Sequence, residues 1–340
     1  MLVLRRGIVT QADAPGAGEQ RLVVDVPGRG PRAAIADIAL VGAADTGDDV
    51  VVNTQAADLE LGSGGFDIVH VNLTRGLDAQ GVPGAHVMKL NYSSLQHAVL
   101  PVEGPVLARL DGAAAVIFLH GQLAPLAWAF GQVRPGGRLG YVQTAGGALP
   151  GGHSRVVREL RDRGLLSGFL TAAPAYGGEG EAISTAGALV HGFADLGWDA
   201  AVCGPGPGIL GSSSALGHGG MAALDSAHTA LALGGEVVIA PRLSSGDPRE
   251  RHQGLSHHAA TVIELLLAPV TVAMPEDFAF ELPEGGPAHH AFAVAVDLAG
   301  YGQSGLPTTT MGRSIDEDQA FFAGALAGGT ALAVRTPERP

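Results

Sequence analysis

Short apolar runs, each broken by glycine, proline or aspartate, follow one another through the first 75 residues of the chain. The runs are rich in β-branched residues and short, which predicts strands rather than helices. Several short strands in close succession are typical of a small barrel or sandwich. The segment from about 76 to 105 has the character of a linker, so we assign residues 1–105 to a β-rich N-terminal domain and its linker. The expected strands are 7–10, 21–26, 33–41, 50–54 and 66–73.

From about residue 110 the pattern changes to apolar strands that alternate with amphipathic helices. Single helices between consecutive strands imply a parallel sheet, and continuously apolar strands imply helices on both of its faces. We therefore expect an α/β fold for residues 106–275, a doubly wound and mostly parallel sheet, joined to a small N-terminal β-barrel-like domain. The expected strands are 114–119, 138–143, 169–173, 200–203, 236–240 and 270–273, and the helices are 122–133, 153–164, 181–195, 219–233 and 256–267.

Residues 276–340 form a third segment, which we expect to pack back on the α/β domain as a strand and a helix. Residues 291–296 are the predicted strand. Ser314 and Glu317 have the spacing of a capping box for the last helix, and Gly328-Gly329 is the predicted end of that helix.

Composition and net charge limit the kinds of molecule that the protein is expected to bind. The 340 residues include 46% hydrophobic and 16% charged residues, so a sizeable core is expected. A net charge of -13 argues against nucleic acid and anionic membranes as partners. One cysteine, an N-terminus without a signal-peptide pattern and the lack of a spanning apolar run predict a cytoplasmic protein. Self-association into a homo-oligomer stays open.

The loops that follow strands are longer and chemically richer than the loops that precede them. In open α/β sheets, ligands bind beyond the carboxyl ends of the strands, so these loops mark the expected site. His120 follows the first strand of the sheet and Thr144 follows the second, and we expect both as ligand contacts. The longest of these loops are 144–152, 204–220 and 242–255.

The loop after the strand 200–203 is rich in glycine and serine. Its residues Gly206-Pro-Gly-Ile-Leu-Gly211 match a dinucleotide-binding pattern, but prolines interrupt it and Arg242 stands where a ribose-binding carboxylate is expected. Three interpretations stay open: an anion-binding nest, an NAD(P) site, and a tight turn in a glycine-rich protein. The residues expected to bind the ligand are Gly204, Gly206, Gly208, Gly211, Ser212, Ser213 and Ser214.

A polar cluster follows the strand 236–240. Asp247-Pro-Arg-Glu250 has the pattern of a helix start, but this leaves Arg249 and Arg251 unexplained, and guanidinium groups bind carboxylate or phosphate. His257 and His258 follow Ser256, the expected cap of the next helix, where the helix dipole keeps imidazole neutral. We name His252, His257 and His258 as candidate catalytic residues. Their spacing does not predict a helical zinc site, so no metal ligand is assigned.

Several blocks resemble an uncharacterised bacterial family, domain of unknown function 3866. They are Val51–Thr54, Asp58–Gly62, His86–Tyr92, Gly146–Pro150, Gly204–Ile209, Asp247–His252 with Ser256–His258, and Thr310–Arg313. The resemblance spans nearly the whole chain and implies no activity, fold or site residues.

From the residues alone we expect a hydrolase or group transferase that acts on a small anionic metabolite, a class that includes phosphorylated compounds. The cofactor is unknown. A non-catalytic small-molecule-binding or regulatory protein is one alternative, and an NADP-dependent oxidoreductase is the other.

Overall fold

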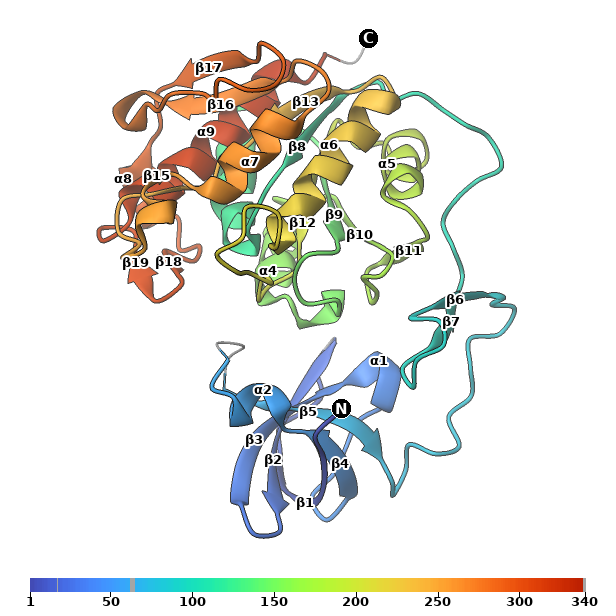
Figure 1. Cartoon of the computed structure of the whole chain (residues 1–340). Helices are drawn as coiled ribbons and strands as arrows, with labels where there is room; N and C mark the ends of the chain where they lie inside the picture. The colour runs from blue at the N-terminus through green and yellow to red at the C-terminus, as the bar shows by residue number, and fades with distance from the viewer. Residues whose placement is uncertain (17, 62–64, 339–340) are drawn as a thin grey trace. The chain divides into compact units, whose positions relative to one another are not determined.

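The chain folds into two compact units, shown in Figure 1. The computed structural model describes residues 1–16, 18–61 and 65–338, so Gly62, the last residue of one family block, lies outside the described residues. The smaller unit comprises residues 1–100 with 150–153, and the larger one comprises 101–149 with 154–340. Among the described residues, none of the helices combines the length and apolarity needed to cross a bilayer.

The smaller unit is a closed five-stranded barrel with the strand order β1-β2-β3-β5-β4. β3 pairs with β5 in parallel, while the other pairs, including β1 with β4, are antiparallel. A short helix, α1 (Ile38–Val41), joins β3 to β4. This order and these directions are those of an OB-fold. The strands are β1 (Leu4–Ala12), β2 (Glu19–Val26), β3 (Gly30–Asp37), β4 (Asp49–Asn53) and β5 (Asp67–Asn72).

The prediction of a strand over 33–41 is wrong at its end. The carboxylate of Asp37 accepts hydrogen bonds from the N–H groups of Ala39 and Leu40, at 3.0 and 3.2 Å, and so caps α1 where the strand was expected to continue. Inside the barrel, Val24, Val50 and Val52 are fully buried, as alternation along half-buried strands requires.

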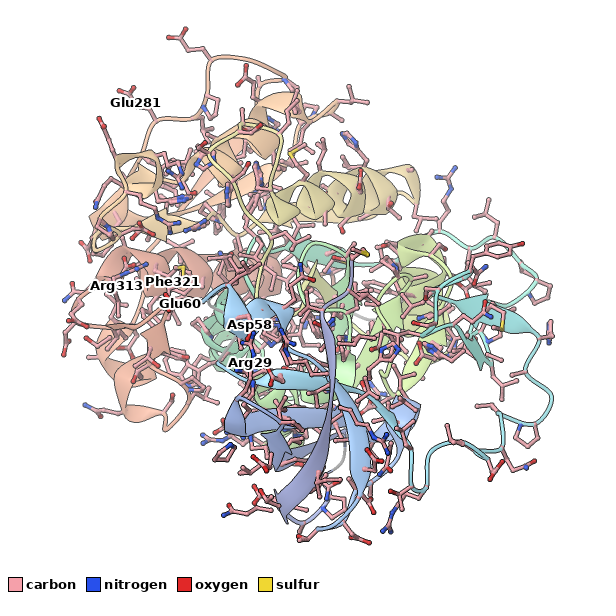
Figure 2. All side chains as sticks on the ribbon, turned by 60° about the horizontal axis from the view of Figure 1, so that its bottom comes forward. Arg29, Asp58, Glu60, Glu281, Arg313 and Phe321 are labelled. Carbon is pink, nitrogen blue, oxygen red and sulfur yellow. The ribbon has the colours of Figure 1, made fainter. Side chains whose placement is uncertain are left out.

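Ion pairs between charged side chains lie on the outside of the barrel. Arg29 donates to Asp58 at 2.8 Å, at the end of α2 (Gln55–Asp58; Figure 2). The predicted linker contains a hairpin of β6 (Val87–Lys89) and β7 (His97–Val99).

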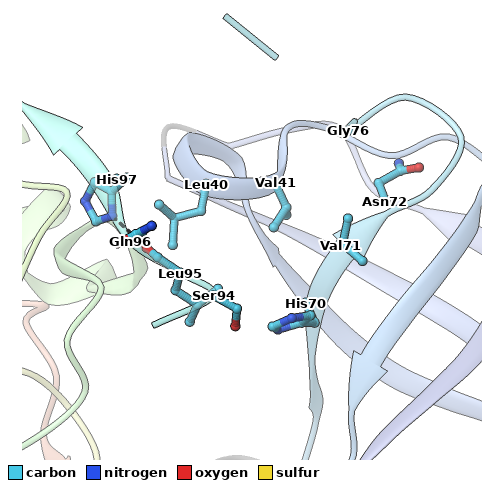
Figure 3. A pocket seen from close by; sticks show the side chains of 10 residues that line it. All are labelled: Leu40, Val41, His70, Val71, Asn72, Gly76, Ser94, Leu95, Gln96 and His97. Carbon is cyan, nitrogen blue, oxygen red and sulfur yellow. Dashed lines mark hydrogen bonds between the residues drawn. The ribbon is translucent and has the colours of Figure 1, made fainter. Parts of the chain in front are cut away.

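A hollow of about 360 Å³ lies between α1, β5 and the segment before β7 (Figure 3). It is lined by Leu40, Val41, His70, Val71, Asn72, Gly76, Ser94, Leu95, Gln96 and His97, none of which was predicted as a site residue.

The larger unit is built on an eight-stranded sheet in which every pair is parallel, which confirms the predicted α/β fold. The strand order is β11-β10-β9-β12-β8-β13-β16-β17. The strands are β8 (Ala113–Val116), β9 (Leu139–Thr144), β10 (Gly168–Ala172), β11 (Gly180–Ala182), β12 (Ala200–Pro205), β13 (Glu236–Ile239), β16 (Thr271–Pro275) and β17 (His290–Val294).

Helices cover both faces of this sheet and bury a separate apolar core on each. The core of one face includes α3 (Leu123–Val133), α4 (Arg155–Asp162), α8 (Leu298–Gln303) and α9 (Gln319–Arg335). The core of the other includes α5 (Thr185–Ala194), α6 (Ala222–Ala232) and α7 (His257–Leu265). The chain leaves β8 and β9 toward the first face, and β12 and β13 toward the second. Because these four strands are neighbours, their carboxyl ends form the kind of switch point where α/β proteins bind ligands.

The prediction that the last helix ends at Gly328-Gly329 is wrong, because α9 continues to Arg335. These glycines serve close packing instead of ending the helix. A Cβ on Gly328 would lie 2.4 Å from the Cβ of Ala240, and one on Gly329 would lie 2.1 Å from the carbonyl oxygen of Leu126. Ser314 and Glu317 do exchange hydrogen bonds, but α9 begins at Gln319, after them.

Candidate functional site

The glycine-rich loops after β9 and β12 pack backbone against backbone. A Cβ on Gly219 would lie 1.9 Å from the carbonyl oxygen of Gly146, and one on Gly147 would lie 2.2 Å from that of Gly206. The N–H of Ala148 donates to the carbonyl of Pro207 at 2.7 Å. These glycines therefore let two loops of the carboxyl edge approach each other, which a side chain would prevent.

The three serines predicted to bind an anion lie in an exposed turn. The Oγ of Ser212 donates to the carbonyl of Gly217 at 2.7 Å, and the Oγ of Ser214 accepts from the N–H of Gly217 at 3.2 Å. Ser213 is exposed, as are Gly208 and Gly211, whereas Gly204 and Gly206 are buried. The helix after this loop, α6, begins at Ala222, far beyond Gly211, so Gly211 does not open a helix as in the dinucleotide-binding pattern.

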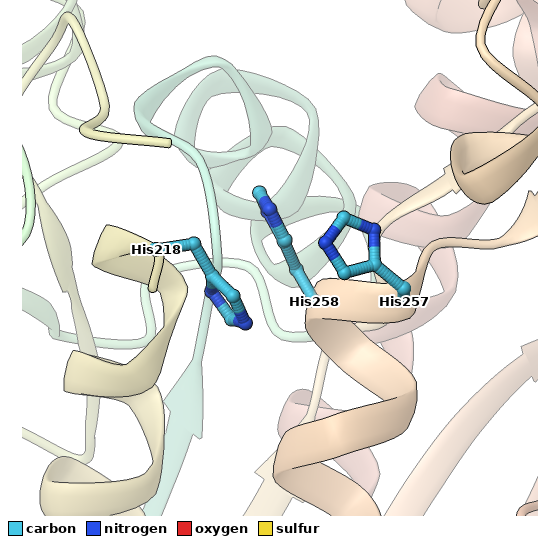
Figure 4. A group of neighbouring side chains, drawn as sticks. All are labelled: His218, His257 and His258. Atoms are coloured by element: carbon cyan, nitrogen blue, oxygen red, sulfur yellow. The ribbon is translucent and has the colours of Figure 1, made fainter. Parts of the chain in front are cut away.

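The end of this loop reaches the predicted histidines through His218, which the sequence analysis did not identify. Its ring is buried and stacks on that of His258, with centroids 3.9 Å apart and planes 15° apart. The ring of His257 is 5.6 Å away (Figure 4). The sequence position of His218 could have predicted this placement. His218 ends a loop that follows a strand, so it lies at the same edge of the sheet as the other candidate residues.

His252, in the turn before α7, lies beside His257 and His258, which begin α7. The centroid of His252 lies 4.8 Å from that of His257 and 5.0 Å from that of His258. Ser256 caps α7, as expected, and its Oγ is hydrogen-bonded to Nδ1 of His252 at 2.8 Å. Nδ1 of His257 lies 3.2 Å from the carbonyl oxygen of Arg251, and Nδ1 of His258 lies 2.9 Å from Nη1 of Arg242.

Burial keeps these four imidazoles neutral. Desolvation, followed by the charge of Arg242, lowers the pKa of His252 to about 3. Desolvation is also the main cause that lowers the pKa of His218, His257 and His258. In the described part of the chain, Nδ1 of His218 and Nε2 of both His257 and His258 are buried without a hydrogen-bond partner. The cluster thus offers ring nitrogens whose hydrogen-bonding capacity is unused.

Arginines and buried carboxylates lie directly beside the histidines. Asp247 is fully buried, and Arg249 holds it with two bonds of 2.8 and 2.7 Å. Arg242 and Arg313 each place a nitrogen 3.6 Å from the same carboxylate. Arg249, whose hydrogen bond is the largest cause, holds the pKa of Asp247 far below its usual range. The interpretation of Asp247 as a helix cap is wrong, because only a 3-10 turn, Glu250–His252, follows it. The side chain of Arg251 is exposed.

The C-terminal segment contributes two residues that the sequence analysis did not assign to the site. Arg313, at the hairpin of β18 (Thr309–Thr310) and β19 (Arg313–Ser314), donates to Asp318 at 2.9 Å. Asp318 is fully buried and also accepts from the hydroxyl of Ser244 at 2.8 Å, in β14 (Leu243–Ser244). β14 pairs with β15 (Gly254–Leu255), so the segment between β13 and α7, here called the polar loop, folds back on itself before α7 begins.

His120 and Thr144, which were expected as ligand contacts, both form hydrogen bonds within the protein. Nε2 of His120 lies 2.7 Å from Oγ of Ser154, and its Nδ1 lies 3.2 Å from the carbonyl oxygen of Pro205. Burial lowers the pKa of His120 to about 4. Thr144 donates to the carbonyl of the next residue at 3.2 Å.

Cys203 is buried, and burial raises the pKa of its thiol to about 12, as expected for a core thiol rather than a nucleophile.

Comparison with known proteins identifies a family. Searches of curated proteins and of solved structures find no match to this chain. The family model described as protein of unknown function (DUF3866) matches residues 33–329. The match includes β4, β5 and most of β3 in the barrel, and all of the histidine and arginine cluster. It covers well over half of the 340 residues, and the chain therefore belongs to the DUF3866 family.

Proposed function

We propose that this protein is an enzyme that hydrolyses, or transfers a group from, a small anionic metabolite bound at the carboxyl edge of the sheet. The observation that carries the proposal is the contact between the imidazole cluster and the arginine cluster, through Arg242 and His258. Guanidinium groups, which can bind an anion, thus lie next to imidazoles, which can accept and donate protons.

The arginine cluster has capacity for an anion. Within the described residues, Arg242, Arg249 and Arg313 pair with two buried carboxylates, those of Asp247 and Asp318. Among the described residues, Nε of Arg242 and Nη2 of Arg313 are buried without a hydrogen-bond acceptor. Buried donors without acceptors are costly, and an anionic oxygen would satisfy them. A phosphate or carboxylate group is therefore the chemical class that we propose for the ligand.

The imidazoles supply the second requirement of the reaction. Because a carbonyl oxygen only accepts, Nδ1 of His257 carries the proton that is donated to Arg251, and its Nε2 carries the lone pair. A lone pair of this kind can accept a proton from an attacking water or hydroxyl group. Hydrolysis and group transfer both use such a proton acceptor for the nucleophile, and the protonated imidazole can then return the proton to the leaving group.

Ligand binding tests the anion site. We expect inorganic phosphate, pyrophosphate or a sugar phosphate to raise the melting temperature of the metal-free protein. Arg313→Gln removes a buried donor that has no acceptor among the described residues, so it should lower the affinity for that anion at least about tenfold. Arg138→Gln is the matched control, because Arg138 lies at the amino end of β9 and donates to Leu196 there. The proposal fails if none of the anions binds or if Arg313→Gln binds as tightly as the wild type.

Turnover separates catalysis from mere binding. We expect His257→Ala to retain anion affinity and to lose most of the turnover, since the imidazole is proposed to move a proton and not to hold the anion. A bound anion that is never converted would favour a regulatory binding protein, and stabilisation by NADP(H) alone would favour an oxidoreductase. A cytoplasmic location is part of the proposal, and the free buried thiol of Cys203 supports it because reduced thiols are typical of that compartment.

A further inference from the structure

Three histidine rings from two separate loops meet at one point of the proposed site. His218 ends the loop before α6, and His257 and His258 begin α7. One ring nitrogen of each residue lies within 4.8 Å of one ring nitrogen of each of the others (Figure 4). His218 and His258 are 6% and 3% exposed, so the rings are held by packing and not by chance surface proximity.

We propose that His218, His257 and His258 bind a divalent transition metal ion of the zinc type. Imidazole nitrogens are the ligands these ions prefer, and three protein ligands with an open fourth position are the pattern of catalytic zinc sites. The inference rests on the proposed function and deepens it. With an ion bound, the Nε2 lone pair of His257 would hold the ion, and the ion would take over the activation of water beside the arginines that hold the anionic ligand. In a tetrahedral site with bonds of about 2.0 Å, ligand nitrogens are roughly 3.3 Å apart, so the ion would draw the rings closer.

The hydrogen bonds of His218 and His257 leave a lone pair available for an ion. Nε2 of His218 donates to the carbonyl of Ala215 at 2.8 Å, and Nδ1 of His257 donates to the carbonyl of Arg251 at 3.2 Å. The opposite nitrogens, Nδ1 of His218 and Nε2 of His257, therefore carry lone pairs. Both are buried and without a donor among the described residues. A ligating histidine whose other nitrogen donates to a backbone carbonyl is the usual arrangement at metal sites.

His258 is the residue whose protonation has to change. Nη1 of Arg242 donates to Nδ1 of His258, so in this arrangement Nε2 carries the proton. Binding through Nε2 requires that this proton leaves Nε2 and that one is taken up at Nδ1, with no net change in charge. Arg242 must then turn away from the ring, and the carboxylate of Asp247, already 3.6 Å from it, is its alternative partner. An anion bound by Arg242 would favour the same movement, which couples the two sites.

Metal binding to the chelator-treated, full-length protein tests the inference. We expect one Zn²⁺ per chain by isothermal titration, with an affinity in the micromolar range or tighter. His218→Ala and His257→Ala should each weaken binding by at least about 100-fold. His290→Ala is the matched control and should bind as the wild type does, because this histidine is exposed on β17. Circular dichroism of each variant shows that it is folded.

A second readout does not depend on affinity. Co²⁺ in place of Zn²⁺ should give the visible absorption of a four-coordinate site with nitrogen ligands, and His218→Ala should remove it. Failure to bind Zn²⁺ with 1:1 stoichiometry, or unchanged binding in folded His218→Ala, would overturn the metal inference. Phosphate binding to the metal-free protein is measured separately. Anion binding without metal binding would remove this inference alone, and metal binding without anion binding would remove the proposed function.

Discussion

Nη1 of Arg242 donates a hydrogen bond to Nδ1 of His258 across 2.9 Å, with both side chains almost completely buried. Arg242 follows β13 and His258 lies in the first turn of α7, so the bond joins the two ends of the polar loop between them. Since a guanidinium only donates, the bond also decides which nitrogen of His258 carries the proton.

Arg242→Met should therefore change the tautomer of His258, although the histidine itself is not substituted. In the wild type, nitrogen-detected NMR of the metal-free protein should show His258 with its proton on Nε2. In the variant, Nδ1 loses its donor and the ring should exchange between both tautomers. The unfolding free energy should fall by about 2 kcal/mol, the usual loss for a hydrogen bond to a charged group. An unchanged His258 spectrum would contradict the assigned hydrogen bond.

Gly219→Ala should destabilise the larger unit by about 1–3 kcal/mol, because the new Cβ would meet the carbonyl oxygen of Gly146 and force two backbones apart. Gly211→Ala is the matched control in the same loop, where a Cβ meets nothing within 4 Å. Urea unfolding of both variants measures the difference. Equal stability of the two would mean that the loops after β9 and β12 do not pack as described.

His120 should make stability depend on pH on the acid side. Its pKa is about 4 in the folded chain and about 6.5 when unfolded, so between these values the unfolded state binds more protons. Stability should accordingly fall as the pH is lowered from about 6.5 to about 4, by up to about 3 kcal/mol from this residue alone. His120→Gln should have a flatter profile in that window, measured by urea unfolding at each pH. Parallel profiles would contradict the assignment.

Asp318→Asn should weaken the connection between the C-terminal segment and the site. The substitution removes the charge that faces Arg313 and one acceptor for the hydroxyl of Ser244. We expect a loss of about 3 kcal/mol in unfolding free energy, since the guanidinium of Arg313 loses a buried partner. Asp316→Asn, at an exposed position two residues earlier, should change stability by less than about 0.5 kcal/mol. Similar losses for both variants would rule out the specific role of Asp318.

Most of the fold could be predicted from the sequence because its strands are short apolar runs between turn residues. β9 and β12, for example, begin within one residue of their predicted starts, although β12 extends two residues further. The errors occur where tertiary contacts override a local signal. Gly328 and Gly329 have the composition of a helix end, yet in α9 they fit beneath Ala240 and Leu126. A sequence pattern does not show what packs against a glycine.

The candidate site was predictable in part. His252, His257 and His258 were predicted because their loop follows a strand. His218 was missed because the glycines and serines around it were themselves interpreted as the binding residues of that loop. Arg313 and Asp318 could not be connected to the site because about 60 residues separate them from α7, and Ser314 and Glu317 offered a local explanation for that segment. Asp247 was interpreted as a helix cap, and its burial could not be predicted because it depends on arginines from two different segments.

The position of α9 in the chain has a consequence for biosynthesis. The barrel strands lie within the first 72 residues, so this unit can close while the remainder is still being translated. α9 is translated after every strand that it covers, and it is Asp318, just before it, that holds the loop after β13. In a nascent chain, the part of the sheet face that α9 covers therefore stays uncovered until α9 leaves the ribosome, and the loop after β13 gains the contact with Asp318 only then.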